Sequence, residues 1–202
     1  MFNKSKWKEI LHHKLPGEKA HLQMAPTFRG EFTSMENPVP AAVMALFYAL
    51  DKETHLVFIK RNEYDGPHSA QVSFPGGVRE QGDLRLEETA LRETREELGI
   101  LEEIEILGSL TPLHIPVSNF MVHPFVGWME ETPVFRPDPA EVQYVIEASL
   151  AGLLDPSNSD SETLFHHGRP IEAPFYRVGK EKIWGATAMM LSEVLQLATS
   201  LL

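Results

Sequence analysis

Three glutamates within one short stretch are the side chains of this sequence best suited to chemistry. The string ALRETREELG places Glu93, Glu96 and Glu97 at positions i, i+3 and i+4. At about 100° of rotation per residue, the three carboxylates share roughly a third of the circumference of a helix. Like charges at these spacings repel each other, so a neutralising partner is expected. Oxygen-rich, water-accessible sites of this kind suit Mg²⁺ or Mn²⁺, which keep bound water and also bind phosphate oxygens.

A pair of glycines precedes this predicted helix. Gly76 and Gly77, in FPGGVREQGD, allow the backbone to approach a ligand closely and to adopt positive φ. A carbonyl from this turn, which we assign to Gly76, is therefore a candidate metal ligand beside the glutamates. The alternative interpretation is an ordinary turn followed by a solvated helix face, on which Glu88, Arg92 and Glu96 form i, i+4 ion pairs.

Together these segments resemble a known motif. The string GGVREQGDLRLEETALRETREELGI resembles the Nudix box, whose second half is matched from Arg92 to Ile100 with Thr94 at the first apolar position. The first half differs, because the acid falls at Asp83 and lies one residue further from Arg92 than in the strict pattern. The same variation is typical of the coenzyme A pyrophosphatase subgroup. In the family this acid pairs with the helix arginine, which implies that Asp83 and Arg92 orient the site.

The segment before the box extends the resemblance. RNEYDGPHSAQVSFPGG is similar to the signature that accompanies coenzyme A hydrolysis in this subgroup, although Asn62, Gly66 and Ala70 depart from it. The resemblance covers about residues 39–195. It implies that substrate is bound by residues of this loop, namely Arg61, His68, Ser73, Phe74, Gly76 and Gly77. A surface ion pair is the alternative role for Arg61, and an ordinary polar loop position is the alternative for His68.

The resemblance implies a metal-dependent hydrolase that splits coenzyme A or an acyl-CoA into 3′,5′-ADP and (acyl-)4′-phosphopantetheine. Its cofactor would be Mg²⁺ or Mn²⁺, held by Gly76 and the three glutamates. Glu141, after RPDP, is a candidate for the base that activates water, the alternative being a surface glutamate at the start of a strand. The predicted catalytic set is Arg92, Glu93, Glu96, Glu97 and Glu141. Other hypotheses are a Nudix pyrophosphatase for ADP-ribose or dinucleotides, a noncatalytic nucleotide-sensing Nudix protein, and an acidic interaction domain.

Composition limits the partners. The 202 residues carry 18 basic and 29 acidic side chains, a net charge of −11, which disfavours binding of nucleic acid through its phosphates. There are no cysteines, so disulfides and thiolate chemistry are excluded and a reducing cytoplasm is compatible. Residues 1–19 lack the pattern of a secretion signal. The apolar C-terminal stretch from Ala186 is interrupted by polar residues and is too short for a bilayer span, so we expect no membrane association.

The remaining pattern predicts the fold class. A nearly unbroken apolar run at 40–50 and a second at 56–60 predict two buried strands joined by a polar turn. Further strands are expected at 71–74, 103–110, 120–130, 141–148, 171–178 and near Ile183, and helices at 6–13, 84–98 and 184–201. This mixture predicts an α/β (α+β) fold with a mixed β-sheet between helices, an α/β/α sandwich.

Two further expectations concern organisation. Residues 1–38 are predicted to form an N-terminal helical extension packed on a Nudix domain at 39–202. A homodimer is compatible with the apolar positions of this arm and of the methionine-bearing last helix.

Overall fold

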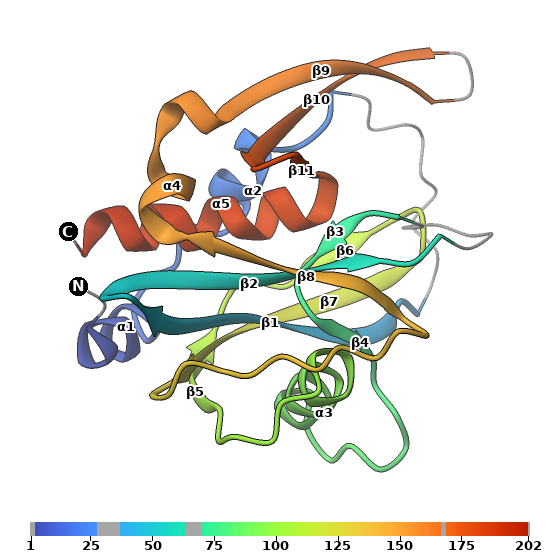
Figure 1. The fold of residues 1–202 in the computed structure, drawn as a ribbon. Helices are drawn as coiled ribbons and strands as arrows, with labels where there is room; N and C mark the ends of the chain where they lie inside the picture. Colours follow the sequence, from blue (N-terminus) through green and yellow to red (C-terminus); the bar gives the residue numbers. More distant parts are fainter. Residues whose placement is uncertain (1–2, 28–36, 64–69, 167–168, 202) are drawn as a thin grey trace.

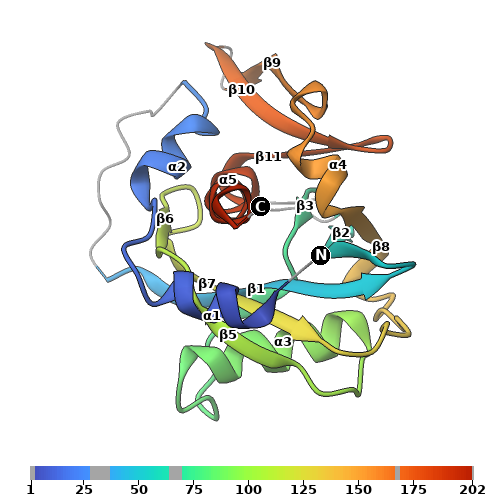
Figure 2. The ribbon, with the colours of Figure 1, turned by 90° about the vertical axis from the view of Figure 1, so that its left-hand side faces the viewer.

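The structure, a computed structural model, describes residues 3–27, 37–63, 70–166 and 169–201. A mixed β-sheet occupies its centre, with helices on both faces (Figures 1 and 2). Eight strands of the described residues form this sheet: β1 Val39–Leu50, β2 Glu53–Arg61, β3 Val72–Ser73, β4 Gly76–Val78, β5 Glu105–Ser109, β6 Leu113–Ile115, β7 Phe120–Met129 and β8 Val142–Ser149. This arrangement confirms the predicted mixed-sheet α/β class.

The centre of the sheet is the parallel pair β1 and β7, aligned from Val39 opposite Phe120 to Tyr48 opposite Met129. The other pairings of this sheet are antiparallel. β1 is apolar throughout because both of its faces are covered. One face contributes Ala45 and Phe47 to one hydrophobic cluster, and the other contributes Met44, Leu46 and Tyr48 to a second cluster.

Each hydrophobic cluster is closed by helices. α3 (Leu86–Leu98) packs on one face of the sheet, where Ala90 and Leu98 join the second cluster. α5 (Gly185–Ser200) and α1 (Lys4–Leu11) lie on the opposite face, and α2 (Glu18–Gln23) packs against α5 (Figures 1 and 2). α3 begins two residues later than the predicted helix because Arg85 is extended, and it ends at Gly99 in the left-handed conformation.

A second, three-stranded sheet follows the first. It contains β9 (Ser159–His166), β10 (Arg169–Val178) and β11 (Glu181–Trp184), and it is reached through the short helix α4 (Leu150–Leu154) and a 3₁₀ turn at Pro156–Asn158. β10 and β11 correspond to the strands predicted at 171–178 and near Ile183. β9, α4, α2, β4 and β6 were not predicted, since each is short or rich in polar residues.

The N-terminal segment shares the core of the rest of the molecule. Trp7, Leu11 and Met24 are buried in the same cluster as α5. At its centre the fully buried Glu193 accepts hydrogen bonds from the Gly17 amide at 2.8 Å and from the amide and hydroxyl of Thr111 at 3.0 and 2.7 Å. The Nε2 atom of the buried His21 lies 3.3 Å from the same carboxylate.

The packing bears on the dimer expectation. Trp7, Leu11, Met24 and Met190 are buried within one chain, whereas Leu22 of α2 is 48% exposed. The homodimer stays a prediction. The division of the chain at residue 38 stays a prediction. In the part of the chain that the structure describes, no helix is both long and apolar enough to cross a membrane.

Candidate active site

The helix α3 presents one side to the sheet and thereby sets the depth of each glutamate. Thr89, Ala90, Thr94 and Leu98 are buried on that side. Thr94, at a position where the Nudix pattern has an apolar residue, satisfies its hydroxyl by donating to the carbonyl of Ala90 at 2.6 Å. Glu97 lies on the same buried side of the helix, whereas Glu96 faces solvent.

Glu97 is the most deeply buried of the three glutamates, with 1% of its surface exposed. Its Oε2 accepts a hydrogen bond from the Gly76 amide at 2.8 Å, and its Oε1 accepts one from Nη1 of Arg61 at 3.1 Å. Burial raises the pKa of Glu97 to about 7, although the Gly76 hydrogen bond and the Arg61 charge oppose the change. Glu93 and Glu141 lie close enough to raise this pKa further.

Glu93 and Glu96 occupy different environments. The side chain of Glu93 is 15% exposed, and burial raises its pKa against the opposing effect of Arg92. The side chain of Glu96 is 60% exposed and accepts a hydrogen bond from Arg92 at 3.0 Å. The structure therefore brings Glu93 and Glu97 together beneath the surface and leaves Glu96 at the rim.

The two glycines provide the space that these carboxylates need. At Gly77 an added Cβ would lie 2.5 Å from the carboxyl group of Glu93. At Gly76, whose φ is +152°, a Cβ would lie 2.3 Å from the carbonyl oxygen of Ala42 in β1. Gly76 and Gly77 belong to β4, which pairs with β1, so the predicted turn is a short strand that holds the Gly76 amide against Glu97.

Arg92 links the helix to the loop before it. It donates to both carboxylate oxygens of Asp83, at 3.2 and 3.0 Å, and to the carbonyl of Val78 at 3.2 Å. The hydrogen bonds from Arg92 hold the pKa of Asp83 well below its usual range, and the Thr89 hydroxyl also donates to it at 2.9 Å. This is the pairing that the Nudix resemblance implied. Arg92 also reaches Glu93 at 2.9 Å, so it orients the carboxylate helix.

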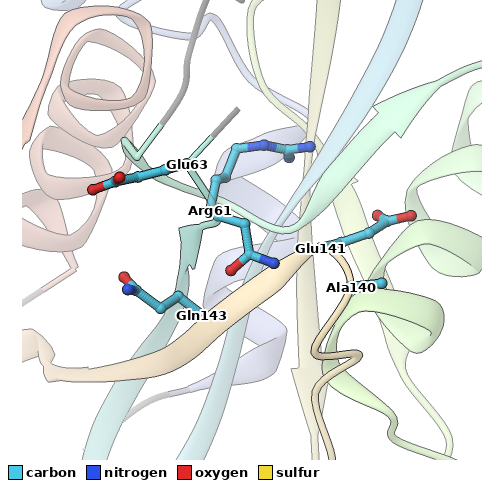
Figure 3. Close-up of a pocket in the computed structure, with 6 residues that line it drawn as sticks. Arg61, Glu63, Ala140, Glu141 and Gln143 are labelled. Carbon is cyan, nitrogen blue, oxygen red and sulfur yellow. The ribbon is translucent and has the colours of Figure 1, made fainter. Parts of the chain in front are cut away.

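Glu141 and Arg61 border a cavity of about 600 Å³ beside the buried carboxylates. Figure 3 shows their side chains extending to the same side, while Glu63 and Gln143 extend to the other. Arg61 ends β2, and Glu141 directly precedes β8. These two strands pair with a register shift between Lys60 and Arg61, an irregularity of the kind that redirects side chains near sites. The cavity is lined by Arg61, Asn62, Glu63, Ala140, Glu141 and Gln143.

The loop that leads to Glu141 is fastened to the end of α3. The Arg136 amide donates to the carbonyl of Leu98 at 2.8 Å, and the Asp138 amide donates to the carbonyl of Glu97 at 3.4 Å. These bonds satisfy carbonyl groups that a helix C-terminus leaves without intrahelical partners. They also fix the start of β8, and with it Glu141, relative to the glutamates of the helix.

Two of the other predicted substrate residues, Ser73 and Phe74, have buried side-chain groups. His68 lies outside the described residues. Phe74 is 1% exposed and stacks on Phe58 with ring centroids 4.9 Å apart. The ring of Phe74, directly after β3, therefore belongs to the core, and its assignment to substrate binding stays a prediction. The hydroxyl of Ser73 is buried without a hydrogen-bond partner among the described residues.

Sequence reasoning missed the part that Asn62 takes in the site. Its side-chain amide donates to the carbonyl of Pro139 at 2.9 Å, and its backbone amide donates to the carbonyl of Glu141 at 3.1 Å. Asn62 thus ties the end of β2 to the loop that carries the candidate base. Only cross-strand pairing of β2 with β8 brings these residues together, and the sequence carries no local signal of that pairing.

The donor atoms fit a divalent cation that keeps part of its water shell. Among the described residues, no group of three or more histidine, aspartate or glutamate side chains is arranged to enclose a metal ion. Glu93 and Glu97 nevertheless place two carboxylates close together in a poorly solvated region, where the charge of Glu93 contributes to the raised pKa of Glu97. Mg²⁺ is commonly bound through one or two carboxylates, with water and substrate phosphates completing its coordination.

Comparisons with known proteins all find similarity to Nudix proteins. The family model described as NUDIX domain matches residues 38–167. The Nudix hydrolase NudL of Photorhabdus laumondii is 32% identical over 162 residues, which cover 80% of this chain and 86% of the relative. The human mitochondrial coenzyme A diphosphatase NUDT8 is 33% identical over 165 residues, covering 79% and 70%. A MutT/nudix family protein from Enterococcus faecalis matches the fold with a TM-score of 0.52 and 17% identity, covering 99% of this chain and 76% of that one.

Proposed function

Because this chain belongs to the Nudix hydrolase family, we propose that it cleaves the phosphoanhydride bond of coenzyme A or acyl-CoA. The products would be 3′,5′-ADP and (acyl-)4′-phosphopantetheine. The observation that carries the proposal is the buried pair Glu93 and Glu97 beside the cavity that Arg61 and Glu141 border. The choice of coenzyme A is supported by the FPGG loop and by the likeness to the human coenzyme A diphosphatase.

Nudix hydrolases generally need divalent metal ions, and we propose Mg²⁺ or Mn²⁺ here. Glu93 and Glu97 would hold the ion, with Glu96 sharing a second ion and the Gly76 carbonyl as a further ligand. When bound, the metal supplies positive charge that neutralises the nonbridging phosphate oxygens.

The residues around this site have separate tasks. Arg92 and Asp83 keep the helix glutamates oriented, since Arg92 contacts both Asp83 and Glu93. Gly77 leaves room for the Glu93 carboxylate. Arg61, which lines the cavity, would bind a substrate phosphate. We assign the Glu141 carboxylate as the acceptor of the proton that the attacking water loses, while the bond between phosphorus and the bridging oxygen breaks.

The proposal is tested by incubating the purified protein with Mg²⁺ or Mn²⁺ and a panel of substrates, followed by mass analysis of products. Coenzyme A and acetyl-CoA should give 3′,5′-ADP and the matching phosphopantetheine. Glu97→Gln should lower turnover by about 100-fold or more, because it removes a buried anionic ligand. Glu87→Gln is the matched control, since Glu87 lies on the same helix and pairs only with the exposed Arg85 among the described residues.

ADP-ribose or a dinucleotide is the alternative substrate, because the sequence departs from the coenzyme A signature at three positions. Asn62, Gly66 and Ala70 depart from the coenzyme A signature, and all three lie in the segment expected to select the substrate. Hydrolysis of ADP-ribose or a dinucleotide without turnover of coenzyme A would redirect the substrate assignment to another nucleoside diphosphate. Binding of nucleotide and metal without any product would favour a sensing role instead.

We also propose that the partners are small molecules and that the protein acts in the cytoplasm. The net charge of −11 disfavours nucleic acid, and the lack of cysteine is compatible with a reducing compartment. A relative from Arabidopsis thaliana is named as mitochondrial, so subcellular fractionation with detection of the protein is the direct test of the compartment.

A further inference from the structure

The two carboxylate oxygens of Glu97 have partners of different kinds. Oε2 accepts from the amide of Gly76, which is fixed by the pairing of β4 with β1. Oε1 accepts from the side chain of Arg61, which is 27% exposed and extends from the end of β2. Only the partner of Oε1 can therefore move away without disturbing the sheet.

Arg61 belongs to two environments at once. Its guanidinium contacts the buried carboxylate, and the same residue lines the cavity beside Glu141 (Figure 3). A buried carboxylate requires a neutralising partner, and Arg61 provides one for Glu97. If a divalent cation binds Glu97, that need would be met, and the guanidinium and the cation would repel each other at the same carboxylate.

We propose that Arg61 exchanges partners: it neutralises Glu97 in the metal-free protein, and divalent metal binding releases it into the cavity to bind a phosphate of the substrate. This inference rests on the proposed function. Arginine suits both positions because its planar group of donors matches a carboxylate as well as a phosphate. The phosphate-binding form of the site would thus be completed only when metal is present.

Calorimetric titration with Mg²⁺ in the absence of substrate tests this exchange directly. At pH 8.5 Glu97 is ionised, since its pKa is about 7. Arg61→Gln removes the competing cation, so Mg²⁺ should bind about tenfold more tightly than to the wild-type protein. In saturating Mg²⁺, the same variant should bind 3′,5′-ADP about tenfold more weakly. The opposite signs of the two changes separate partner exchange from a structural role.

Two further variants serve as controls. Lys60→Gln removes the same charge from the neighbouring position, but Lys60 pairs with Glu181 at 2.8 Å and not with a site glutamate. It should leave the affinities for Mg²⁺ and for 3′,5′-ADP within about twofold of the wild-type values. Arg61→Lys keeps the charge but loses the planar donors, so Mg²⁺ affinity should stay near the wild-type value while 3′,5′-ADP binds more weakly.

The possible outcomes distinguish failure of the partner exchange from failure of the proposed function. Tighter Mg²⁺ binding with weaker nucleotide binding in folded Arg61→Gln supports the exchange. Unchanged or weaker Mg²⁺ binding in that variant overturns it, provided that wild-type protein binds Mg²⁺ and hydrolyses coenzyme A. If Arg61→Gln does not fold, equal 3′,5′-ADP affinity of Arg61→Lys and wild type overturns it. If wild-type protein neither binds Mg²⁺ nor hydrolyses any substrate of the panel, the proposed function itself fails.

Discussion

At the scale of single residues, Glu97 combines two opposing properties. Burial favours its protonated form and raises its pKa to about 7, whereas metal binding requires the ionised carboxylate. The Gly76 amide and the Arg61 guanidinium reduce the cost of the charge without removing it. If Glu97 binds a cation as proposed, the ionised site would be less stable without that cation and would favour cation binding for the same reason.

This conflict predicts a pH-dependent stability in the presence of a chelator. The pKa of Glu97 is raised in the folded state from its usual value near 4.5 to about 7. Below pH 4.5 Glu97 is protonated in both the folded and the unfolded state. As pH rises through about 7, the free energy of unfolding of the wild-type protein should fall by about 1–3 kcal/mol, whereas that of Glu97→Gln should not show this fall. Urea unfolding of both proteins at several pH values from 4.5 to 8.5 measures this difference. A constant difference over that range would contradict the burial of the charge.

Gly77 offers a second test at this scale. In Gly77→Ala the new Cβ would lie 2.5 Å from the Glu93 carboxyl group, the flexible end of a side chain. We expect turnover to fall by about 100-fold because the carboxylate is displaced, whereas the free energy of unfolding should fall by less than about 1 kcal/mol. Steady-state kinetics and urea unfolding measure the two quantities.

Gly82→Ala is the matched control for this experiment, since nothing lies within 4 Å of its Cβ position. It should leave both turnover and stability close to wild type. Equal turnover of the two variants would show that Glu93 does not need the space at Gly77.

At the scale of elements, the important contact joins the end of α3 to the loop before β8. Gly99 has φ of +61°, and a Cβ there would lie 1.9 Å from the carbonyl oxygen of Arg136. Gly99→Ala should therefore destabilise the protein and lower turnover, because the loop that positions Glu141 must move. Unfolding in urea and measurement of kcat check both effects.

Gly185→Ala separates the cost of the positive φ from the cost of the steric contact with Arg136. Gly185 has a nearly identical φ of +62° with nothing within 4 Å of its Cβ position, so it carries only the conformational cost, about 1–2 kcal/mol. Gly99→Ala should cost at least about 1 kcal/mol more and should alone reduce kcat. If both variants lose the same stability and keep the same kcat, the loop contact does not position Glu141.

The elements also show what the sequence could predict. Long apolar or amphipathic segments such as β1, α3 and α5 were predicted because their periodicity reflects burial. β4 was missed because Gly76 and Gly77 resemble a turn, and its strand conformation depends on pairing with β1. In the site, the grouping of Glu93 with Glu97 follows from spacing along the helix, whereas the Arg92–Asp83 pair was implied by the resemblance to the Nudix box. The contact of Arg61 with Glu97 and the position of Asn62 depend on pairing between strands, which no local pattern specifies.

At the scale of the whole molecule, Glu193 links α5 to two distant segments of the chain. It accepts hydrogen bonds from Gly17 and Thr111 and faces His21. Burial would raise the pKa of Glu193, but the bonds from His21, Thr111 and Gly17 outweigh it and lower the pKa. Glu193→Ala leaves these donors buried without an acceptor, so the free energy of unfolding at pH 7 should fall by about 3 kcal/mol or more. Urea unfolding measures the loss.

Glu9→Ala, at an exposed position of α1, is the control and should change the free energy of unfolding by less than about 0.5 kcal/mol. The expected loss in Glu193→Ala should shrink as pH falls below about 4.5, because the lowered pKa of Glu193 means that its stabilisation is lost on acidification. A Glu193→Ala variant as stable as Glu9→Ala would show that the buried carboxylate does not hold these segments together.

The position of Glu193 also has a consequence for the order of events during synthesis on the ribosome. Gly17 and His21 emerge early, yet their carboxylate partner lies 176 and 172 residues further along the chain. Until that segment leaves the exit tunnel, Trp7 and Leu11 cannot be buried against α5. Nascent chains with such exposed apolar side chains bind chaperones and are prone to aggregation. Packing of this part of the chain is therefore expected to be completed only after the segment that carries Glu193 has left the ribosome.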